Sequence, residues 1–177
     1  MARRLTGLTV VATASRPETI TWSEKMGAHH VIDHHHPLDE QLGRIGLPQV
    51  DYVLGLTASE KHVPAIVNAI APQGKFALID DPETLDIVPL KQKSVSVHWE
   101  FMFTRSFYQT PNMIEQHHLL DQVADLVDGG VLHTTMTEDF GPINASSLRR
   151  AHRRVEGGRT IGKTVLSGFG EGDAWPP

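Results

Sequence analysis

Five histidines gather in the stretch HHVIDHHHP, residues 29–37, and raise the question of a metal site. Histidine is the commonest metal ligand in proteins, and the chain has no cysteine to share that role. The stretch has no set of spaced carboxylates, however, and loop histidines readily bind adventitious nickel or zinc. His35 and His36 lead into Pro37 and a helix start, where side chains are exposed by default. We therefore expect no functional metal site in this cluster.

A second stretch with chemical potential is SRPET, residues 15–19, which follows an apolar run. The guanidinium group of Arg16 can form two parallel hydrogen bonds to a phosphate, and the hydroxyls of Ser15 and Thr19 can donate to the same group. An exposed arginine in an ordinary loop explains the stretch equally well. The choice between a phosphate contact and an exposed loop arginine depends on the strands and helices that position Arg16.

Short apolar runs of strand length recur at regular intervals over the first 80 residues. Segments with the pattern of amphipathic helices separate them, for example 59–74, where Ser59 is a plausible N-cap. Strands that are apolar at nearly every position, alternating with such helices, predict a parallel sheet that is covered on both faces. The fold class is therefore α/β with a doubly wound sheet, and its first strands are 8–14, 30–33, 50–56 and 74–80.

The rest of the chain is less regular, and we expect it to belong to the same domain, over residues 1–169, with a flexible tail at 170–177. The elements predicted after residue 80 are a strand at 94–101, a long helix at about 110–128, an extended segment at 131–136, a helix at 144–158 and a strand at 162–168.

Composition excludes several classes of protein. The chain has 177 residues, 40% of them hydrophobic, and a formal net charge of −5. This length supports one substantial core, and the negative charge argues against a general nucleic-acid-binding protein. The basic run LRRAHRR, residues 148–154, is more typical of a solvated helix face. No apolar run reaches the roughly 20 residues that cross a bilayer, and no signal peptide leads the chain, so we expect a cytoplasmic protein with no membrane partner.

The strand at 8–14 has features of the second strand of a dinucleotide-binding sheet, not of the first. In that fold the first strand leads into a Gly-rich turn, and the residue that handles the adenosine ribose follows about 20 positions later. A carboxylate at that position selects NAD, whereas this chain has Ser15 and Arg16. Counting back about 20 positions from Ser15 puts the glycines before Met1, so the first strand and the Gly-rich turn are predicted to be missing.

Six phrases of the sequence together carry a resemblance to a known family. They are TVVATASRPET, KMGAHHVIDH, VDYVLGLT, APQGKFALIDDP, HWEFMFTRS and AHRRVEGGRTIGKTVLSGF. With these phrases the chain resembles the C-terminal, cofactor-binding half of the medium-chain dehydrogenase/reductase superfamily, in the branch of zinc-type alcohol dehydrogenase-like and quinone oxidoreductase-related proteins. The resemblance implies a Rossmann-type domain without its first strand and Gly-rich turn, with NADP as cofactor and no catalytic zinc.

Ligands of open α/β sheets bind beyond the carboxyl ends of the strands, and the expected cofactor contacts lie there. The resemblance favours the phosphate role for Ser15, Arg16 and Thr19, and it places His34 where related reductases often carry a tyrosine beside the adenosine. Asp80 could instead form a turn, and Lys163 could be an exposed residue at a strand start. The other expected contacts are Leu56 and Thr57 near the ribose, Ile79, Asp80, Phe101, Met102 and Phe103 near the nicotinamide, and Thr160 and Lys163 in the last segment.

The resemblance implies that the parent enzyme transfers hydride to a small molecule, namely a quinone, an activated alkene or a carbonyl compound. The half alone is expected to be inactive, and residues 131–169 would contact the missing catalytic domain. Related reductases dimerise through the strand equivalent to 94–101, which contains no proline or lysine that would block pairing, so we expect a homodimer. The alternative is a non-catalytic oligomerisation or binding module.

Overall fold

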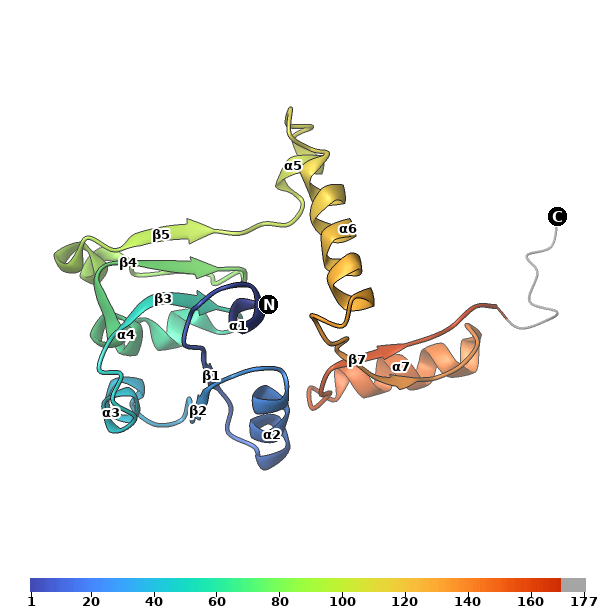
Figure 1. Cartoon of the computed structure of the whole chain (residues 1–177), viewed down its shortest axis with the longest axis horizontal. Coiled ribbons are helices and arrows are strands. Elements are labelled where there is room, and N and C mark those ends of the chain that lie inside the picture. Colours follow the sequence, from blue (N-terminus) through green and yellow to red (C-terminus); the bar gives the residue numbers. More distant parts are fainter. Residues whose placement is uncertain (170–177) are drawn as a thin grey trace. The chain divides into compact units, whose positions relative to one another are not determined.

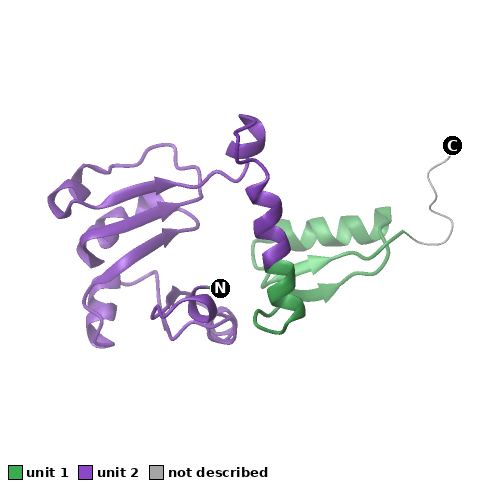
Figure 2. Ribbon diagram, turned by 45° about the horizontal axis from the view of Figure 1, so that its top comes forward, with its two compact units in different colours: residues 1, 123–177 green, residues 2–122 purple. Residues whose placement is uncertain are grey.

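A computed structural model of the protein describes residues 1–169, and their contacts divide them into two compact units (Figure 2). The N-terminal unit comprises residues 2–122, and the C-terminal unit comprises Met1 and the residues from Val123 onward. The predicted flexible tail at 170–177 lies outside the described residues.

The N-terminal unit contains five strands, all of them parallel to their neighbours (Figure 1). They confirm the predicted α/β fold, and each predicted apolar run of the first 80 residues overlaps one strand. The fourth strand begins at Ile70, so the last residues of the predicted helix at 59–74 belong to the sheet. β1 pairs with β2, and a separate sheet has the order β3-β4-β5. The strands are β1 (Val11–Thr13), β2 (His30–Ile32), β3 (Val50–Gly55), β4 (Ile70–Leu78) and β5 (Ser96–Trp99).

Helices connect the strands of this unit and begin and end where the local chemistry favours it. Pro17 opens α2 at the first helical position, where its missing N–H is not needed. Gly27 follows the helix with a φ of +111°, a conformation that glycine adopts without strain. The helices of the first 70 residues are α1 (Ala2–Leu5), α2 (Pro17–Lys25), α3 (Leu38–Arg44) and α4 (Ser59–Ala69).

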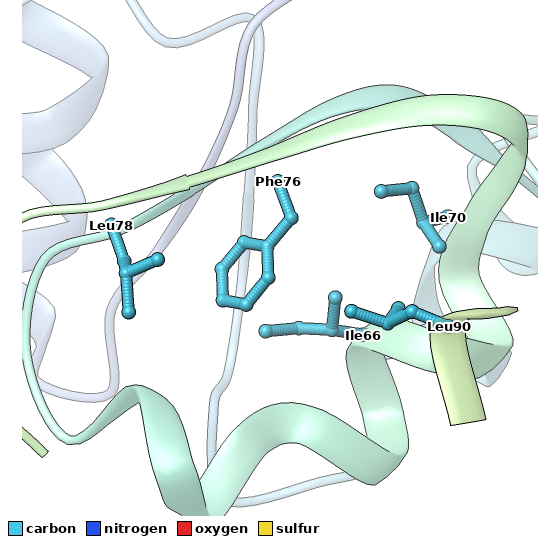
Figure 3. Packing of buried hydrophobic residues seen from close by; sticks show 5 residues of the cluster. All are labelled: Ile66, Ile70, Phe76, Leu78 and Leu90. Carbon is cyan, nitrogen blue, oxygen red and sulfur yellow. The ribbon is translucent and has the colours of Figure 1, made fainter. Parts of the chain in front are cut away.

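The main core of the unit lies between α4 and one face of the three-stranded sheet (Figure 3). Phe76 and Leu78 of β4 point toward Ile66 of α4, and Ile70 and Leu90 close one side of the cluster. The side chains of Ile70, Phe76 and Leu78 are fully buried. Burial of each such side chain contributes roughly 1.5–3 kcal/mol to folding, so this cluster holds β4 in place against α4.

A second apolar cluster connects the two sheets of the unit. Ile32 of β2, Leu42 of α3 and Ala69 of α4 are buried together. Val11, the first residue of β1, and Val50, the first residue of β3, pack against them. The two sheets therefore share an apolar anchor although no hydrogen bond between strands joins β1 to β3 within the described residues.

The interruption between β1 and β3 has a simple structural explanation. A Rossmann sheet has the strand order 3-2-1-4-5-6, so its first strand lies between the second and the fourth. With β1 as second strand and β3 as fourth, the interruption falls at the position of the first strand, as predicted from the spacing before Ser15.

The segment after β4 differs in detail from the sequence prediction. The 3-10 helix η1 (Val88–Lys93) and the short helix α5 (Thr104–Phe107) were not predicted. The long helix α6 (Glu115–Asp128) begins later than the predicted residue 110, because residues 111–114 form turns after Pro111. α6 crosses the boundary between the two units.

The C-terminal unit contains a parallel pair, β6 (Met136–Asp139) and β7 (Lys163–Val165), joined through α7 (Ala145–Glu156). The predicted extended segment at 131–136 ends where β6 begins, so that prediction was placed too early. Asn144 caps α7, since its side-chain oxygen accepts hydrogen bonds from the N–H groups of Ser146 and Ser147. The guanidinium carbon of Arg150 lies 4.1 Å from the ring centre of Phe140.

Candidate functional site

The candidate site of the N-terminal unit consists of the segments that follow the carboxyl ends of its strands. Ser15 follows β1, His34 follows β2, Leu56 follows β3, Asp80 follows β4 and Phe101 follows β5. Because parallel strands end at the same edge of a sheet, this is the place where an α/β sheet binds its ligand. A surface hollow lined by residues such as Val88 and Lys91 lies beside η1, which precedes β5 and thus belongs to the opposite edge.

Arg16 is the N-cap residue of α2, so its side chain leaves the backbone at the N-terminus of a nine-residue helix. One guanidinium nitrogen lies 3.4 Å from a carboxylate oxygen of Glu18, and the Arg16 side chain is 30% exposed. The remaining N–H groups of a guanidinium can still bind an anion, which the helix N-terminus also attracts. A phosphate bound here would compete with the Glu18 carboxylate for the Arg16 guanidinium group.

Thr19 takes part in the local cap of the same helix. Its hydroxyl donates to the Arg16 carbonyl at 2.9 Å and accepts from the Arg16 N–H at 3.3 Å. A role as phosphate donor therefore requires the hydroxyl to leave the Arg16 carbonyl. Thr19 positions Arg16 in this structure.

Asp80 forms the best defined polar contact of the candidate site. One oxygen of its carboxylate accepts from the Ser59 N–H and the other from the Ser59 hydroxyl, each at 2.7 Å. The main-chain hydrogen bond from Ser59 is the largest cause that lowers the pKa of Asp80 below its ordinary value of 3.8. Ser59 itself is buried.

This contact corrects the prediction that Ser59 is the N-cap of its helix. The N-cap residue of α4 is Ala58, whose positive φ of 50° and apolar side chain offer no cap. The Asp80 carboxylate caps the helix from the neighbouring strand instead, 21 positions along the chain. Asp80 therefore joins β4 to α4, a role that was not predicted from the sequence, and its contact with the cofactor stays a prediction.

The histidine cluster contains an Asx turn at Asp33, and the imidazole rings of neighbouring histidines lie close to one another. An oxygen of Asp33 accepts from the His35 N–H at 2.9 Å, and this main-chain bond is the largest cause that lowers the pKa of Asp33. The ring of His34 lies 4.4 Å from that of His35 and 6.4 Å from that of His62, which belongs to α4.

Asp33, His34 and His35 are the one set of possible metal ligands within residues 1–169, with donor atoms within 4.8 Å of one another. The three residues are exposed or half-buried, and one Asp33 oxygen is already engaged by the turn. The grouping offers fewer than the four ligands typical of a closed zinc site. The expectation of no functional metal site stays a prediction.

The segments after β3 and β5 present apolar side chains to solvent. Leu56, Phe101, Met102 and Phe103 are each more than half exposed, and the rings of Phe101 and Phe103 lie 5.5 Å apart, edge to face. Thr57 is exposed, and Ile79 is exposed beside Asp80. Apolar groups left in water at the expected binding edge are suited to cover a flat, partly apolar ligand.

Two predicted contacts, Thr160 and Lys163, belong to the C-terminal unit. The Thr160 hydroxyl donates to the Arg154 carbonyl at 2.9 Å and so helps to end α7. Lys163 is exposed at the start of β7, where its main-chain N–H donates to Thr135. The local geometry thus gives both residues a structural role at a strand entry, and a cofactor contact stays a prediction.

Two residues of the site were not predicted from the sequence: Ser59, which donates hydrogen bonds to Asp80, and His62, whose ring lies beside that of His34. No local pattern could reveal either contact, because the partners lie 21 and 28 positions apart. Only the strand-to-helix packing brings them together.

The helices of the described part of the chain are all too short or too polar to cross a membrane.

Comparison with known proteins places these features in a family. The sequence profile of the zinc-binding dehydrogenases matches residues 26–166. A zinc-type alcohol dehydrogenase-like protein of Staphylococcus aureus is 35% identical over 162 residues, which are 91% of this chain and 48% of the relative. The chain thus spans about half the length of the curated relatives it matches.

Solved structures agree with the profile. A Rhizobium etli protein assigned as a zinc-dependent alcohol dehydrogenase is 51% identical, with a TM-score of 0.89 over 96% of this chain and 49% of that one. A mycobacterial protein solved in complex with NADPH shares the fold at 24% identity, with a TM-score of 0.72 over 93% of this chain and 50% of that one. The chain therefore belongs to the zinc-binding dehydrogenase family of the medium-chain dehydrogenase/reductase superfamily, and it corresponds to the Rossmann-like cofactor-binding half of these enzymes.

Proposed function

We propose that this chain binds the nicotinamide cofactor of an oxidoreductase, and that the cofactor is NADPH. The observation that carries the proposal is Arg16 at the N-terminus of α2, directly after β1, where an NAD-specific sheet has a carboxylate. Its guanidinium group would bind the 2′-phosphate, with Ser15 and the helix N-terminus as further donors. His34 and His62 would flank the adenosine.

The chemistry of the parent enzyme would be hydride transfer from the nicotinamide to a quinone, an activated alkene or a carbonyl compound. The exposed apolar side chains after β3 and β5, such as Leu56 and Phe101, would cover the nicotinamide ribose and ring. Their role would be to position the cofactor and to exclude water from it. Because the chain spans half of its relatives, we expect the half alone to transfer no hydride.

No catalytic zinc is assigned to these residues, although the family name refers to zinc. The chain has no cysteine, and none of the three residues of the Asp33–His34–His35 grouping is buried. The residues that would hold the cofactor do not need a metal for that task.

The cofactor assignment is tested by replacing Arg16 with Asp in the full-length enzyme. Loss of a charge-assisted phosphate contact costs about 1.5–3 kcal/mol, so the KM for NADPH should rise roughly tenfold to a hundredfold while the KM for NADH stays unchanged. Arg44→Asp is the matched control, because Arg44 also pairs with a nearby glutamate, at 3.3 Å, but lies in α3. Equal loss with both cofactors would refute the phosphate assignment.

A second candidate function is that of an oligomerisation module, and the edge strand β5 favours it. β5 has only β4 as a neighbour among the described strands, and Trp99 is 61% exposed. An uncovered edge of this kind pairs readily with another strand. We propose that a second copy of the chain pairs there, which is compatible with a role in cofactor binding.

A further inference from the structure

The loop between β3 and α4 is short, and it is held at both ends. It consists of the three residues 56–58, at the edge where the sheet is expected to bind its cofactor. At one end, the Gly55 carbonyl accepts a hydrogen bond from the Ile79 N–H at 3.1 Å. At the other end, the N–H and the hydroxyl of Ser59 each donate to the Asp80 carboxylate at 2.7 Å. Two adjacent residues after β4 therefore fix both ends of the loop.

Ser59 has a place of its own in the packing of β3 and β4 against α4. The residue is 2% exposed, and its buried hydroxyl needs a partner, which Asp80 supplies. Gly55 leaves the space for this side chain, because a Cβ added at Gly55 would collide with the Ser59 hydroxyl oxygen. The same Cβ would lie only 3.2 Å from Phe76 and 3.3 Å from Leu78. We refer to Gly55, Ser59 and Asp80 together as the clamp.

The backbone of Ala58 shows what the clamp does to the loop. Ala58 has a φ of 50° and a ψ of 37°, in the left-handed region, although it carries a Cβ. Steric contacts of the Cβ lower the population of this conformation roughly tenfold relative to the right-handed region. Both polar groups of the peptide unit after Ala58 are engaged: its carbonyl accepts from the Lys61 N–H at 3.0 Å, and the Ser59 N–H donates to Asp80. The clamp thus holds the loop in a shape that the local sequence does not favour.

The shape of the loop decides how two of the predicted cofactor contacts are presented. Leu56 and Thr57 are exposed, whereas Gly55 and Ser59 on either side of the loop are buried. A return of Ala58 to the right-handed or the extended region would redirect the chain and move both exposed residues relative to the edge of the sheet. The position of Leu56 and Thr57 therefore depends on a carboxylate that belongs to another strand end.

We propose that Asp80 is a positioning residue for the cofactor: through Ser59 it holds the loop at 56–58 in the shape that meets the nicotinamide ribose. This inference rests on the proposed function in cofactor binding. NADH and NADPH share the nicotinamide ribose, so the clamp serves both cofactors alike, in contrast to Arg16. Loss of the clamp leaves a smaller fraction of the protein in the binding-competent shape, and the apparent affinity for the cofactor falls by that fraction.

The first experiment tests the clamp in this chain, without any cofactor. The nuclear Overhauser effect between the amide and Cα protons of Ala58 reports its φ, because these two protons are closest together at positive φ. We expect a strong effect in the unmodified chain and a weak one in Asp80→Ala. Gly55→Ala should have the same result, since the added Cβ displaces the Ser59 hydroxyl. Asp81→Ala is the matched control, because Asp81 is an exposed neighbour outside the clamp, and it should leave the effect unchanged.

The second experiment measures steady-state kinetics of the full-length enzyme. Asp80→Ala should raise the KM for NADPH and the KM for NADH by the same factor, about tenfold, and change kcat less. Adding Ala58→Gly to this variant should restore most of the KM, because glycine adopts the left-handed conformation without the clamp. Ile66→Val is the control for a general loss of stability: it shortens a core side chain of the same helix, does not touch the clamp, and should leave both KM values unchanged.

Several results would overturn the proposal. They are a positive φ of Ala58 that both clamp variants retain, unchanged KM values in Asp80→Ala, an equal rise in Ile66→Val, and no recovery with Ala58→Gly. If Asp80→Ala does not fold, Asp80→Asn takes its place; it retains one acceptor oxygen and should show the same changes to a smaller degree. The first experiment contains no cofactor and the second compares NADPH with NADH, so failure of the clamp and failure of the Arg16 assignment are distinguished.

Discussion

Replacement of Asp80 tests whether a carboxylate on β4 supplies the cap that α4 lacks. Both oxygens are engaged, one with the Ser59 N–H and one with the Ser59 hydroxyl, at 2.7 Å. Loss of an N-cap costs about 0.5–2 kcal/mol, and a hydrogen bond to a charged group is worth about 1.5–3 kcal/mol when it is well shielded. Asp80 is half-buried, so we expect Asp80→Ala to lower the free energy of unfolding of the N-terminal unit by about 2 kcal/mol.

Variants at the same contact separate the contributions of the hydroxyl hydrogen bond and of the carboxylate charge to this loss of unfolding free energy. Ser59→Ala retains the main-chain donor and should cost about 1 kcal/mol from the lost hydroxyl bond. Asp80→Asn retains an acceptor oxygen but not the charge, and should fall between the unmodified chain and Asp80→Ala. Asp81→Ala is the control, because Asp81 is an exposed neighbour, and its effect should stay within about 0.5 kcal/mol.

The pH dependence gives an independent check. The folded-state pKa of Asp80 is lowered, so the carboxylate stabilises the fold at pH values above its ordinary pKa of 3.8. This contribution is lost as the pH falls through the lower folded-state pKa. The difference between the unmodified chain and Asp80→Asn should therefore be constant from pH 5 to 7 and shrink below about pH 4.

Urea unfolding followed by the fluorescence of Trp22 and Trp99, both in the N-terminal unit, measures these free energies. Hydrogen exchange of the first amides of α4 reports the local effect. If Asp80→Ala and Asp81→Ala were equally stable, or if the Asp80 effect were the same at pH 3 and pH 7, the capping argument would be wrong.

Two further predictions concern association and metal. The unmodified chain should be a homodimer at micromolar concentration by light scattering; Val97→Pro removes an outward-facing N–H of β5 and should release monomer, and a monomeric unmodified chain would contradict the β5 interface. Because Val97 also packs against the Phe76 cluster, circular dichroism must show that this variant is folded. Untagged protein purified without metal-affinity resin should carry no stoichiometric metal by elemental analysis, and one zinc per chain that is lost in a His34→Ala/His36→Ala variant would show that the histidine cluster is a site.

Much of the fold could be predicted because its signals are local. The apolar runs at 30–33 and 50–56 became β2 and β3, and Pro17 and Gly27 marked the two ends of α2. The sequence also predicted the interruption of the sheet between β1 and β3, because Ser15 and Arg16 follow the first apolar run where the second strand of such a sheet has its ribose-binding residue. Helix starts were less certain: α6 begins at Glu115, since the turns after Pro111 override the apolar periodicity that continues through them.

The candidate site shows the limit of this reasoning. The strand-end positions of Ser15, His34, Leu56 and Asp80 follow from the order of strands, which the sequence by itself determined through residue periodicity and turn chemistry. Only the tertiary structure decided what each side chain does there: Asp80 caps α4 through Ser59, and His34 lies beside His62. These partners are far apart in sequence, and their contact depends on how β4 and α4 pack, to within a fraction of a turn or one residue of register. A one-residue change would turn the side chains to another face without altering the local pattern that predicts a strand or a helix.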